Sequence, residues 1–156
     1  MNIKLFNKYK NVGLNVADKF ILDLEELGRI HFPNEFGGFL FGNYSRDFFD
    51  LNVLAHITPE TYLNSPYLFE RNIDNIKHLF KTMYEQYNYY YIGEWHTHPL
   101  SSSMYSQTDL SAMHNIANHH SVTIYNPVLL ILDMNRLRMR DFSFYLYDNK
   151  RLHKYE

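Results

Sequence analysis

The sequence predicts an α/β domain in which a mixed β-sheet is flanked by helices. Three observations lead to this fold class. The chain has 156 residues, and no Ser- or Gly-rich linker divides it, so residues 1–156 are expected to form a single domain. Apolar residues make up 46% of the chain, which is enough to build a buried core. Strand-like and helix-like segments follow one another in the order β-α-β-β-α-β-α-β-β, and this alternation is typical of a sheet covered by helices.

The first half of the chain is expected to supply three strands and one helix. Residues 11–17 alternate in polarity and predict a short strand, and Asp18 is a candidate N-cap for the helix that follows. Pro33 ends the helical pattern, whose apolar positions are Phe20, Ile21, Leu24, Leu27 and Ile30. Residues 36–44 form an apolar run with three glycines, which suits a buried strand with close backbone neighbours. Another strand is predicted at residues 49–57.

The middle of the chain contains the clearest helical pattern. After a predicted loop at residues 59–67, apolar side chains recur at spacings of three or four over residues 69–88. These side chains are Phe69, Ile73, Ile76, Phe80, Met83 and Tyr87. Residues 89–98 are rich in β-forming residues and predict a central strand, followed by a loop at residues 99–105 with three consecutive serines. A further helix is expected at residues 106–120.

Two more strands complete the predicted sheet. Residues 127–134 are mostly apolar and predict a strand. Residues 138–147 alternate between apolar and polar side chains, as in a strand with one exposed face. The aromatic side chains around Asn88 are expected to pack in the core, and they are Tyr87, Tyr89, Tyr90 and Tyr91.

The composition excludes several classes of protein. Cysteine is absent, which excludes disulfides, thiolate zinc sites, iron–sulfur clusters and cysteine nucleophiles, so a metal must be held by nitrogen and oxygen. The net charge is −2, so no overall basic field indicates a nucleic-acid partner. No window of 18 apolar residues predicts a membrane span, and the first ten residues lack the apolar stretch of a signal peptide. We therefore expect a cytoplasmic protein without a membrane or nucleic-acid partner.

The segment from His96 to Asp109 carries the strongest chemical signal. Side chains two residues apart share one face of a strand, so His96 and His98 are expected to point to the same side of the sheet. The strand ends at Pro99, and a helix that begins at Ser106 can return Asp109 to the end of that strand. Two imidazoles and one carboxylate leave a tetrahedral zinc ion one open position, which is typical of a catalytic site.

Structural alternatives exist for each part of this pattern. A His pair on a buried strand can be a hydrogen-bonded part of the core. Ser106 and Asp109 also match an N-terminal capping box, which is compatible with a ligand role because it would hold the helix that presents Asp109. His114, His119 and His120 are not expected to form a second metal site. Other zinc sites do not match, because deaminase-type sites need cysteines, the HExxH motif is absent and a barrel hydrolase needs about 250 residues.

A zinc-dependent hydrolase also needs a general base, and two glutamates are candidates. Glu35 precedes the glycine-containing strand, and Glu94 lies two residues before His96 on the same face of the central strand. Glu35 can also be a solvated loop residue, and Glu94 can pair with a basic neighbour or lie at the sheet edge. The positions of the two residues alone leave this choice open. Trp95 and Thr97 point away from the histidines and are expected in the core, and residues 61–67 are a candidate to flank the cleft.

These residues resemble the JAMM signature of the JAB/MPN/Mov34 metallopeptidases. The match consists of His96-x-His98, a gap of seven residues, Ser106-x-x-Asp109 and an upstream Glu35 in a Glu-x-Gly-Gly context. The resemblance extends over roughly residues 11–147 in the order of predicted elements. It implies an MPN/JAB fold, a deaminase-like sandwich with a curved mixed sheet flanked by helices.

The resemblance also implies a role for each residue of the motif. His96, His98 and Asp109 would bind one zinc ion. Glu35, rather than Glu94, would be the general base and would later protonate the leaving amine. Ser106 would stabilise the oxyanion. Every motif position is intact, unlike in inactive MPN relatives that have lost metal ligands.

The activity implied by the resemblance is hydrolysis of an amide at the C-terminus of a ubiquitin-like or E1/E2-conjugated protein. The sequence of residues 93–99 resembles that of standalone bacterial JAB proteins. These include proteins in type II CBASS anti-phage operons, which also encode E1/E2-like enzymes. Two alternatives are a catalytically silent MPN-type interaction module and an amide hydrolase that acts on a small-molecule or carrier-protein conjugate.

Overall fold

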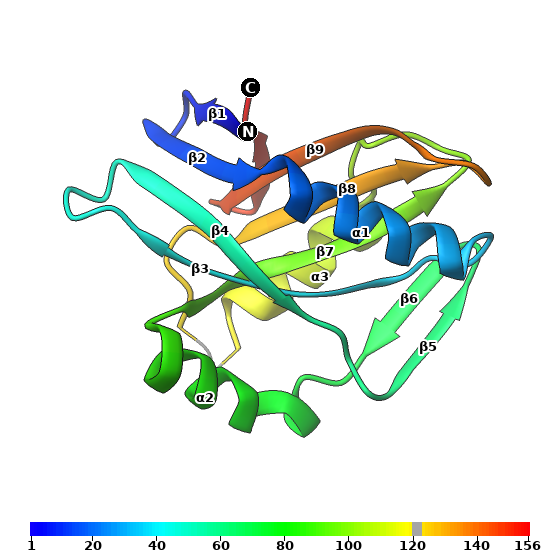
Figure 1. Cartoon of the computed structure of the whole chain (residues 1–156), viewed down its shortest axis with the longest axis horizontal. Coiled ribbons are helices and arrows are strands. Elements are labelled where there is room, and N and C mark those ends of the chain that lie inside the picture. The colour runs from blue at the N-terminus through cyan, green and yellow to red at the C-terminus, as the bar shows by residue number, and fades with distance from the viewer. Residues whose placement is uncertain (120–122) are drawn as a thin grey trace.

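A mixed eight-stranded β-sheet forms the centre of the computed structural model, which describes residues 1–119 and 123–156 (Figure 1). The strand order within these described residues is β1-β2-β4-β3-β7-β8-β9-β10. The strands of this sheet are β1 (Asn2–Asn7), β2 (Val12–Ala17), β3 (Gly37–Tyr44), β4 (Asp50–Ile57), β7 (Tyr90–Pro99), β8 (Val128–Met134), β9 (Met139–Asp148) and β10 (Arg151–Lys154). The predicted α/β fold class with a mixed sheet is confirmed.

The large sheet contains two parallel strand pairs, and each needs a connection that crosses over the sheet. β2 pairs with β4 and β7 pairs with β8 in parallel, whereas the other neighbours in the large sheet are antiparallel. A parallel pair requires a crossover connection, and helix α3 (Gln107–Ala117) lies within the connection from β7 to β8. This crossover brings Asp109, in the first turn of α3, beside His98 of β7.

Helices cover both faces of the large sheet (Figure 1). Helix α1 (Asp18–His31) buries Phe20, Ile21 and Leu24 in the main core, which includes apolar residues of β2, β3, β7 and β8. Helix α3 contributes Met113 to a second cluster on the opposite face of β8. Helix α2 (Lys77–Tyr87) packs Phe80 near Phe39 and Tyr91.

Residues 62–71 form a hairpin in place of the predicted loop and the start of the predicted helix. β5 (Tyr62–Ser65) pairs antiparallel with β6 (Leu68–Arg71), and the next elements are a 3-10 turn (Asp74–Ile76) and α2. The prediction of a helix over residues 69–76 is therefore wrong, although the helix at Lys77–Tyr87 is confirmed. The spacing of Phe69 fits a helix, but its ring instead packs near the ring of Tyr62 in the hairpin and near the ring of Phe36 outside it. A tertiary contact here overrides a local periodicity.

Three other differences concern the ends of elements. Strands β1 and β10 were not predicted, and the two chain ends lie together because Phe6 and Glu156 exchange two backbone hydrogen bonds of 2.8 and 2.9 Å. Ala17 is the N-cap of α1 and makes no side-chain cap, so the prediction of Asp18 as N-cap is wrong by one residue. His120, the predicted end of the last helix, lies outside the described residues.

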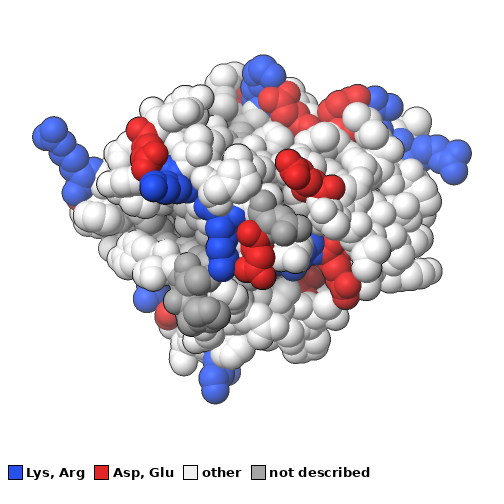
Figure 2. Space-filling view, turned by 90° about the horizontal axis from the view of Figure 1, so that it is seen from below, with Lys and Arg blue, Asp and Glu red and all other residues white. Residues whose placement is uncertain are grey.

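The surface around α2 and the hairpin is mixed in charge. Figure 2 shows lysine and arginine side chains interspersed with aspartate and glutamate on this face, with wide uncharged areas between them. No helix in the described part of the chain is long and apolar enough to cross a membrane.

Candidate metal centre

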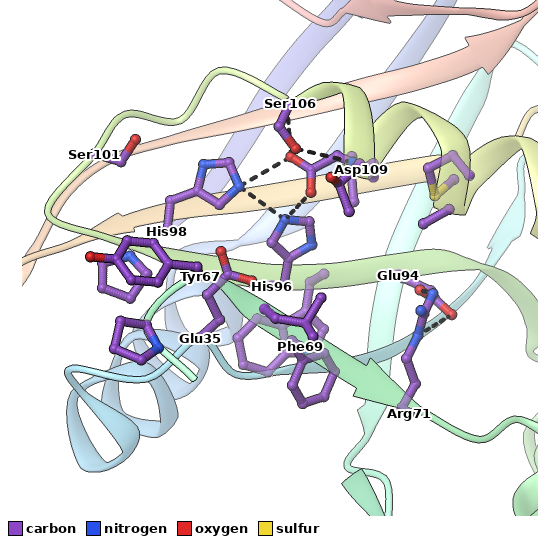
Figure 3. Close-up of a pocket in the computed structure, with 18 of the residues that line it drawn as sticks. Glu35, Tyr67, Phe69, Arg71, Glu94, His96, His98, Ser101, Ser106 and Asp109 are labelled. Carbon is purple, nitrogen blue, oxygen red and sulfur yellow. Dashed lines mark hydrogen bonds and ion pairs between the residues drawn. The ribbon is translucent and has the colours of Figure 1, made fainter. Parts of the chain in front are cut away.

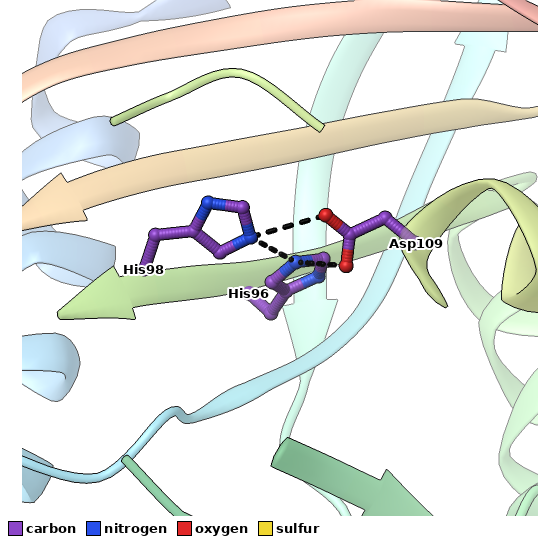
Figure 4. Close-up of side chains that lie close together, drawn as sticks. All are labelled: His96, His98 and Asp109. Carbon is purple, nitrogen blue, oxygen red and sulfur yellow. Dashed lines mark hydrogen bonds and ion pairs between the residues drawn. The ribbon is translucent and has the colours of Figure 1, made fainter. Parts of the chain in front are cut away.

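His96 and His98 lie on β7 and share the face of the sheet that α3 covers (Figure 4). β7 is held between β3 and β8, where His96 aligns with Gly37 on one side and Ile131 on the other. A strand with partners along both edges holds its side chains at a fixed spacing. The strand therefore presents both rings in one direction, as the sequence predicts.

Asp109 comes from the first turn of α3 through a complete capping box. The backbone N–H of Ser106 donates to Asp109 Oδ2 at 2.7 Å, and the Ser106 hydroxyl accepts a bond of 3.1 Å from the backbone N–H of Asp109. These reciprocal bonds satisfy the N-terminus of the helix and fix the carboxylate. The expected capping box is therefore present, and it also points the Asp109 carboxylate toward the two histidines.

The three side chains converge on one point (Figure 4). His96 Nε2 lies 3.0 Å from Asp109 Oδ1, and His98 Nε2 lies 3.1 Å from Asp109 Oδ2. The two Nε2 atoms are 3.1 Å apart. The two imidazole nitrogens and the carboxylate oxygens therefore face one small volume, where together they could hold a metal cation.

The other ring nitrogen of His98 is already occupied. Its Nδ1 lies 2.8 Å from the carbonyl oxygen of Ser102, and a carbonyl only accepts, so Nδ1 carries the hydrogen and the lone pair of Nε2 faces Asp109. A metal-binding histidine usually has such a partner on its second nitrogen. Neighbouring carbonyls of this loop are also held, since Arg140 donates to Ser101 and the Tyr145 hydroxyl donates to Ser103, each at 2.8 Å.

The electrostatics of the cluster favour a cation. Burial would raise the pKa of Asp109, but hydrogen bonds with His96 and His98 and the Ser106 N–H hold it well below its usual range. Burial lowers the pKa of His98, but its hydrogen bond with Asp109 and the charge of that carboxylate outweigh this and raise the pKa. Asp109 is therefore an anionic ligand at neutral pH. The donor set of two imidazoles and one carboxylate fits zinc.

Glu35 is brought to the same centre by the end of β3. The backbone N–H of Phe36 donates to the Thr97 hydroxyl at 3.0 Å, and the N–H of Thr97 donates to the Phe36 carbonyl at 2.8 Å. The next residue, Gly37, lies so close to β7 that a Cβ there would be 2.1 Å from the Trp95 carbonyl oxygen. The absence of a side chain at this position lets the two strands approach and places Glu35 beside the histidines.

The Glu35 carboxylate points toward the rings of His96 and His98 (Figure 3). It is half-buried, and burial raises its pKa, while the charges of the two histidines act in the opposite direction. A carboxylate with a raised pKa that lines a cavity is suited to accept and return a proton.

Glu94 has a different environment from Glu35. It is buried, its Oε1 accepts a bond of 3.1 Å from Nε of Arg71, and its other oxygen forms an ion pair with the same guanidinium. The Tyr91 hydroxyl also donates to Oε1 at 3.2 Å. Both oxygens are thus engaged, and the geometry favours Glu35 as the free carboxylate at the centre. The alternative in which Glu94 pairs with a basic neighbour is correct.

A cavity of about 490 Å³ opens over these residues. Its lining includes Glu35, the three convergent side chains, Ser106, and the hairpin residues Pro66, Tyr67 and Leu68. The expectation that residues 61–67 flank a cleft is confirmed at Pro66 and Tyr67. Tyr67 is 90% exposed and Leu100 is 68% exposed, so the rim of the cavity presents apolar side chains to solvent.

Several residues around the site have roles that the sequence pattern does not indicate. Thr97, expected only as core, is buried but also bonds the backbone next to Glu35. Arg71 and the Ser102 carbonyl carried no local signal, since their partners lie on other elements. Trp95 and Tyr91 are buried as expected, whereas Tyr87 and Tyr90 are 56% and 52% exposed, so the core assignment is wrong for these two.

Comparison with known proteins assigns the chain to a family. The family model described as prokaryotic homologs of the JAB domain matches residues 19–144. The chain therefore belongs to this family, and the predicted JAB-type resemblance is confirmed. Among characterised relatives, it is 33% identical over 100 residues to the CD-NTase/cGAS isopeptidase of Enterobacter hormaechei subsp. hoffmannii (strain UCI 50). The match covers 64% of this chain and 55% of that protein, so the chain spans about half the length of this curated relative.

Solved structures support the same fold. A protein from Desulfitobacterium hafniense superimposes with a TM-score of 0.66 at 18% identity, covering 89% of this chain and 87% of that chain. A protein from Salinibacter ruber (strain DSM 13855) gives a TM-score of 0.58 at 17% identity, covering 90% and 87%. At these identities the likeness concerns the fold alone.

Proposed function

We propose that the chain is a zinc-dependent isopeptidase that hydrolyses the amide between the C-terminus of a ubiquitin-like or E1/E2-conjugated protein and its target. The observation that carries the proposal is the convergence of His96, His98 and Asp109 in a cavity that Glu35 and Ser106 also line. An interaction module without activity does not require an oriented His98 ring, a fixed Asp109 carboxylate and Glu35 to lie in one cavity.

In the proposed mechanism, His96, His98 and Asp109 hold the metal. Bound zinc would supply Lewis-acid chemistry, which makes water more acidic and an amide carbonyl more electrophilic. Glu35 accepts the proton of the attacking water and then delivers it to the departing nitrogen, so the same carboxylate serves twice. The Ser106 oxygen already accepts from the Asp109 N–H, which leaves its hydroxyl hydrogen free to donate to the carbonyl oxygen as that atom becomes negative.

The hairpin provides a place for the acyl side of the substrate. β6 pairs with β5 alone among the described strands, so the other edge of β6 offers unpaired backbone groups beside the cavity. An extended C-terminal tail can add to such an edge as a further strand. Backbone pairing would hold the tail, while the apolar rim at Tyr67 and Leu100 contacts its side chains.

The name of the Enterobacter relative supports a CD-NTase/cGAS conjugate as the substrate. E1/E2-like enzymes would then be the makers of that conjugate. This assignment would place the chain in the bacterial cytoplasm and in anti-phage defence. The matched region is only part of that relative, so the substrate is tested directly below.

The test uses the purified chain and a fusion in which the CD-NTase of the source organism is joined through its C-terminal residue to green fluorescent protein. We expect close to one zinc ion per chain and cleavage after the last CD-NTase residue, detected by mass spectrometry. A chelator should abolish cleavage, and zinc should restore it. Glu35→Gln should retain zinc but lose activity by a factor of about 10² or more, because it removes the proton acceptor.

The matched control is Glu60→Gln, which makes the same change at an exposed glutamate outside the cavity. It should cleave like the wild type. A folded protein without zinc would contradict the metal assignment. A zinc-loaded wild type that is as inactive as Glu35→Gln on this fusion and on carrier-protein conjugates would favour a binding module instead.

A further inference from the structure

The buried ion pair between Arg71 and Glu94 connects two separate sheets. Arg71 is the last residue of β6, and Glu94 lies on β7 two residues before His96. The contact is two-pronged, with Nε bonded to one carboxylate oxygen and a terminal nitrogen paired with the other. Their side chains are 19% and 8% exposed. Two-pronged guanidinium–carboxylate contacts fix relative orientation as well as distance.

Apolar contacts also tie the hairpin to the body of the protein, because Tyr62 and Phe69 pack against the main core and the Tyr62 ring lies near His31. The strands of the hairpin pair only with each other among the described strands. One backbone bond of 2.8 Å runs from the N–H of Glu35 to the Ser65 carbonyl, and the rings of Tyr62 and Phe69 pack near Phe36. All three contacts lie on the Phe36 side of the hairpin, so Arg71 is the polar anchor at the end of β6 nearest α2.

The pair also forms a wall between two hollows. Both side chains line the cavity that contains Glu35, and both line a smaller hollow of about 230 Å³ beside Ala112 and Ile116 of α3. Figure 3 shows the two side chains meeting at the edge of the cavity, away from His98 and Asp109. Neither side chain reaches the convergent ligand atoms, so the pair shapes the substrate side of the cavity.

A buried ion pair is a poor source of stability, because desolvation of two charges offsets their attraction. Such a pair instead fixes the relative position of the two strands from which its side chains come. Tyr91 strengthens this arrangement, since its hydroxyl bonds Glu94 while its ring packs near Phe80 and Phe39. Glu94 therefore has a fixed position to which the hairpin can be fastened.

We propose that Arg71 and Glu94 form a latch that holds the β5–β6 hairpin against β7, so that the edge of β6 is preformed for the acyl tail of the substrate. The two residues are positioning residues that act on substrate binding, separately from metal binding and proton transfer. This inference rests on the proposed function only for its kinetic arm, because the position and mobility of the hairpin are measured without a substrate.

The experiment compares Arg71→Met, Glu94→Gln and the double variant by hydrogen exchange, zinc content and kinetics on the CD-NTase–fluorescent-protein fusion. In both single variants, amide exchange in residues 62–71 should rise by about tenfold or more, while exchange in β8 changes little. Zinc content should stay at the wild-type level. KM should rise by about tenfold with kcat within about a factor of two, because binding and not chemistry is affected.

The double variant separates a latch from a purely structural role. Each single change leaves one buried charge without its partner, whereas the double change leaves none. We expect the unfolding midpoint to be closer to wild type in the double variant than in the single variants, while hairpin exchange and KM stay as high as in the single variants. A KM that recovers together with stability would overturn the latch.

The matched control is Lys81→Met, which breaks an exposed ion pair with Glu85 on α2 and should leave all three measurements unchanged. Hairpin exchange equal to wild type in the single variants, or loss of zinc with an unchanged KM, would also refute the proposal. If the wild type fails to cleave any conjugate, the proposed function fails, but the exchange data still decide whether the pair holds the hairpin.

Discussion

Thr97→Val tests how the fold positions Glu35. The Thr97 side chain is completely buried, and its hydroxyl accepts the backbone N–H of Phe36 at 3.0 Å. Valine has nearly the same shape but no acceptor, so the substitution removes one hydrogen bond without creating a large cavity. The reciprocal bond from the Thr97 N–H to the Phe36 carbonyl remains available.

The expected cost follows from the buried N–H that loses its partner. Phe36 is 1% exposed, so water cannot replace the lost acceptor, and such a group costs about 1–3 kcal/mol. For a chain of this size, about 2 kcal/mol lowers the unfolding midpoint by about 4–8 °C. The same loss loosens the backbone beside Glu35, and a displacement of about 1 Å at a catalytic group can reduce the rate by about 10²-fold.

The assay combines urea unfolding with cleavage of the CD-NTase fusion by the zinc-loaded protein. Thr97→Ser is the matched control, because it keeps the acceptor but removes the methyl group that faces Gly28 of α1. It should lose about 1 kcal/mol of stability and keep near-normal kcat. Thr97→Val that is as stable as the wild type, or that is destabilised but cleaves at the normal rate, would refute the reasoning.

Three other predictions concern the same centre. Gly37→Ala should lower the free energy of unfolding by roughly 3 kcal/mol, because the new Cβ would meet the Trp95 carbonyl; urea unfolding checks this, and an unchanged midpoint would show that β3 and β7 can separate without loss. Ser106→Ala should cost about 1 kcal/mol of stability through loss of the cap and reduce kcat by about 10²-fold or more through loss of the oxyanion donor; a stability loss with normal kcat would leave only the capping role. Activity should fall when the pH is lowered through the raised pKa of Glu35, because the protonated carboxyl cannot accept a proton. The acidic limb of the kcat/KM profile should therefore lie above the ordinary pKa range of glutamate. A limb at or below that range would contradict the environment assigned to Glu35.

Most of the fold and the ligand set follow from local patterns. The alternation of a strand makes His96 and His98 neighbours whatever surrounds them, and the capping box determines where α3 begins. Both features depend on residues within a few positions of one another. They are therefore readable without knowledge of the rest of the chain.

The errors occur where a distant segment decides the local structure. The apolar spacing at Phe69 fits a helix, but a strand at this position buries the ring near Phe36 and Tyr62. The missed strand β1 is a different case, because it pairs with β2, its neighbour in the sequence. Its side chains are mostly exposed or half-buried, so it has no apolar run that would predict a core strand. Tyr87 and Tyr90 were assigned to the core because a sequence does not say which faces of neighbouring elements are covered.

The sequence by itself determined that the chain has a nitrogen- and oxygen-based site of two histidines and one aspartate, and that it resembles a JAB domain. The resemblance implies Glu35 rather than Glu94, and only the tertiary structure shows how their environments differ, because Arg71 engages Glu94 from another sheet while Thr97 and Gly37 bring Glu35 to the histidines. The physical reason is the range of the interactions involved. Backbone periodicity and helix capping act over a few residues, whereas a buried charge takes its role from the partner that folding places beside it.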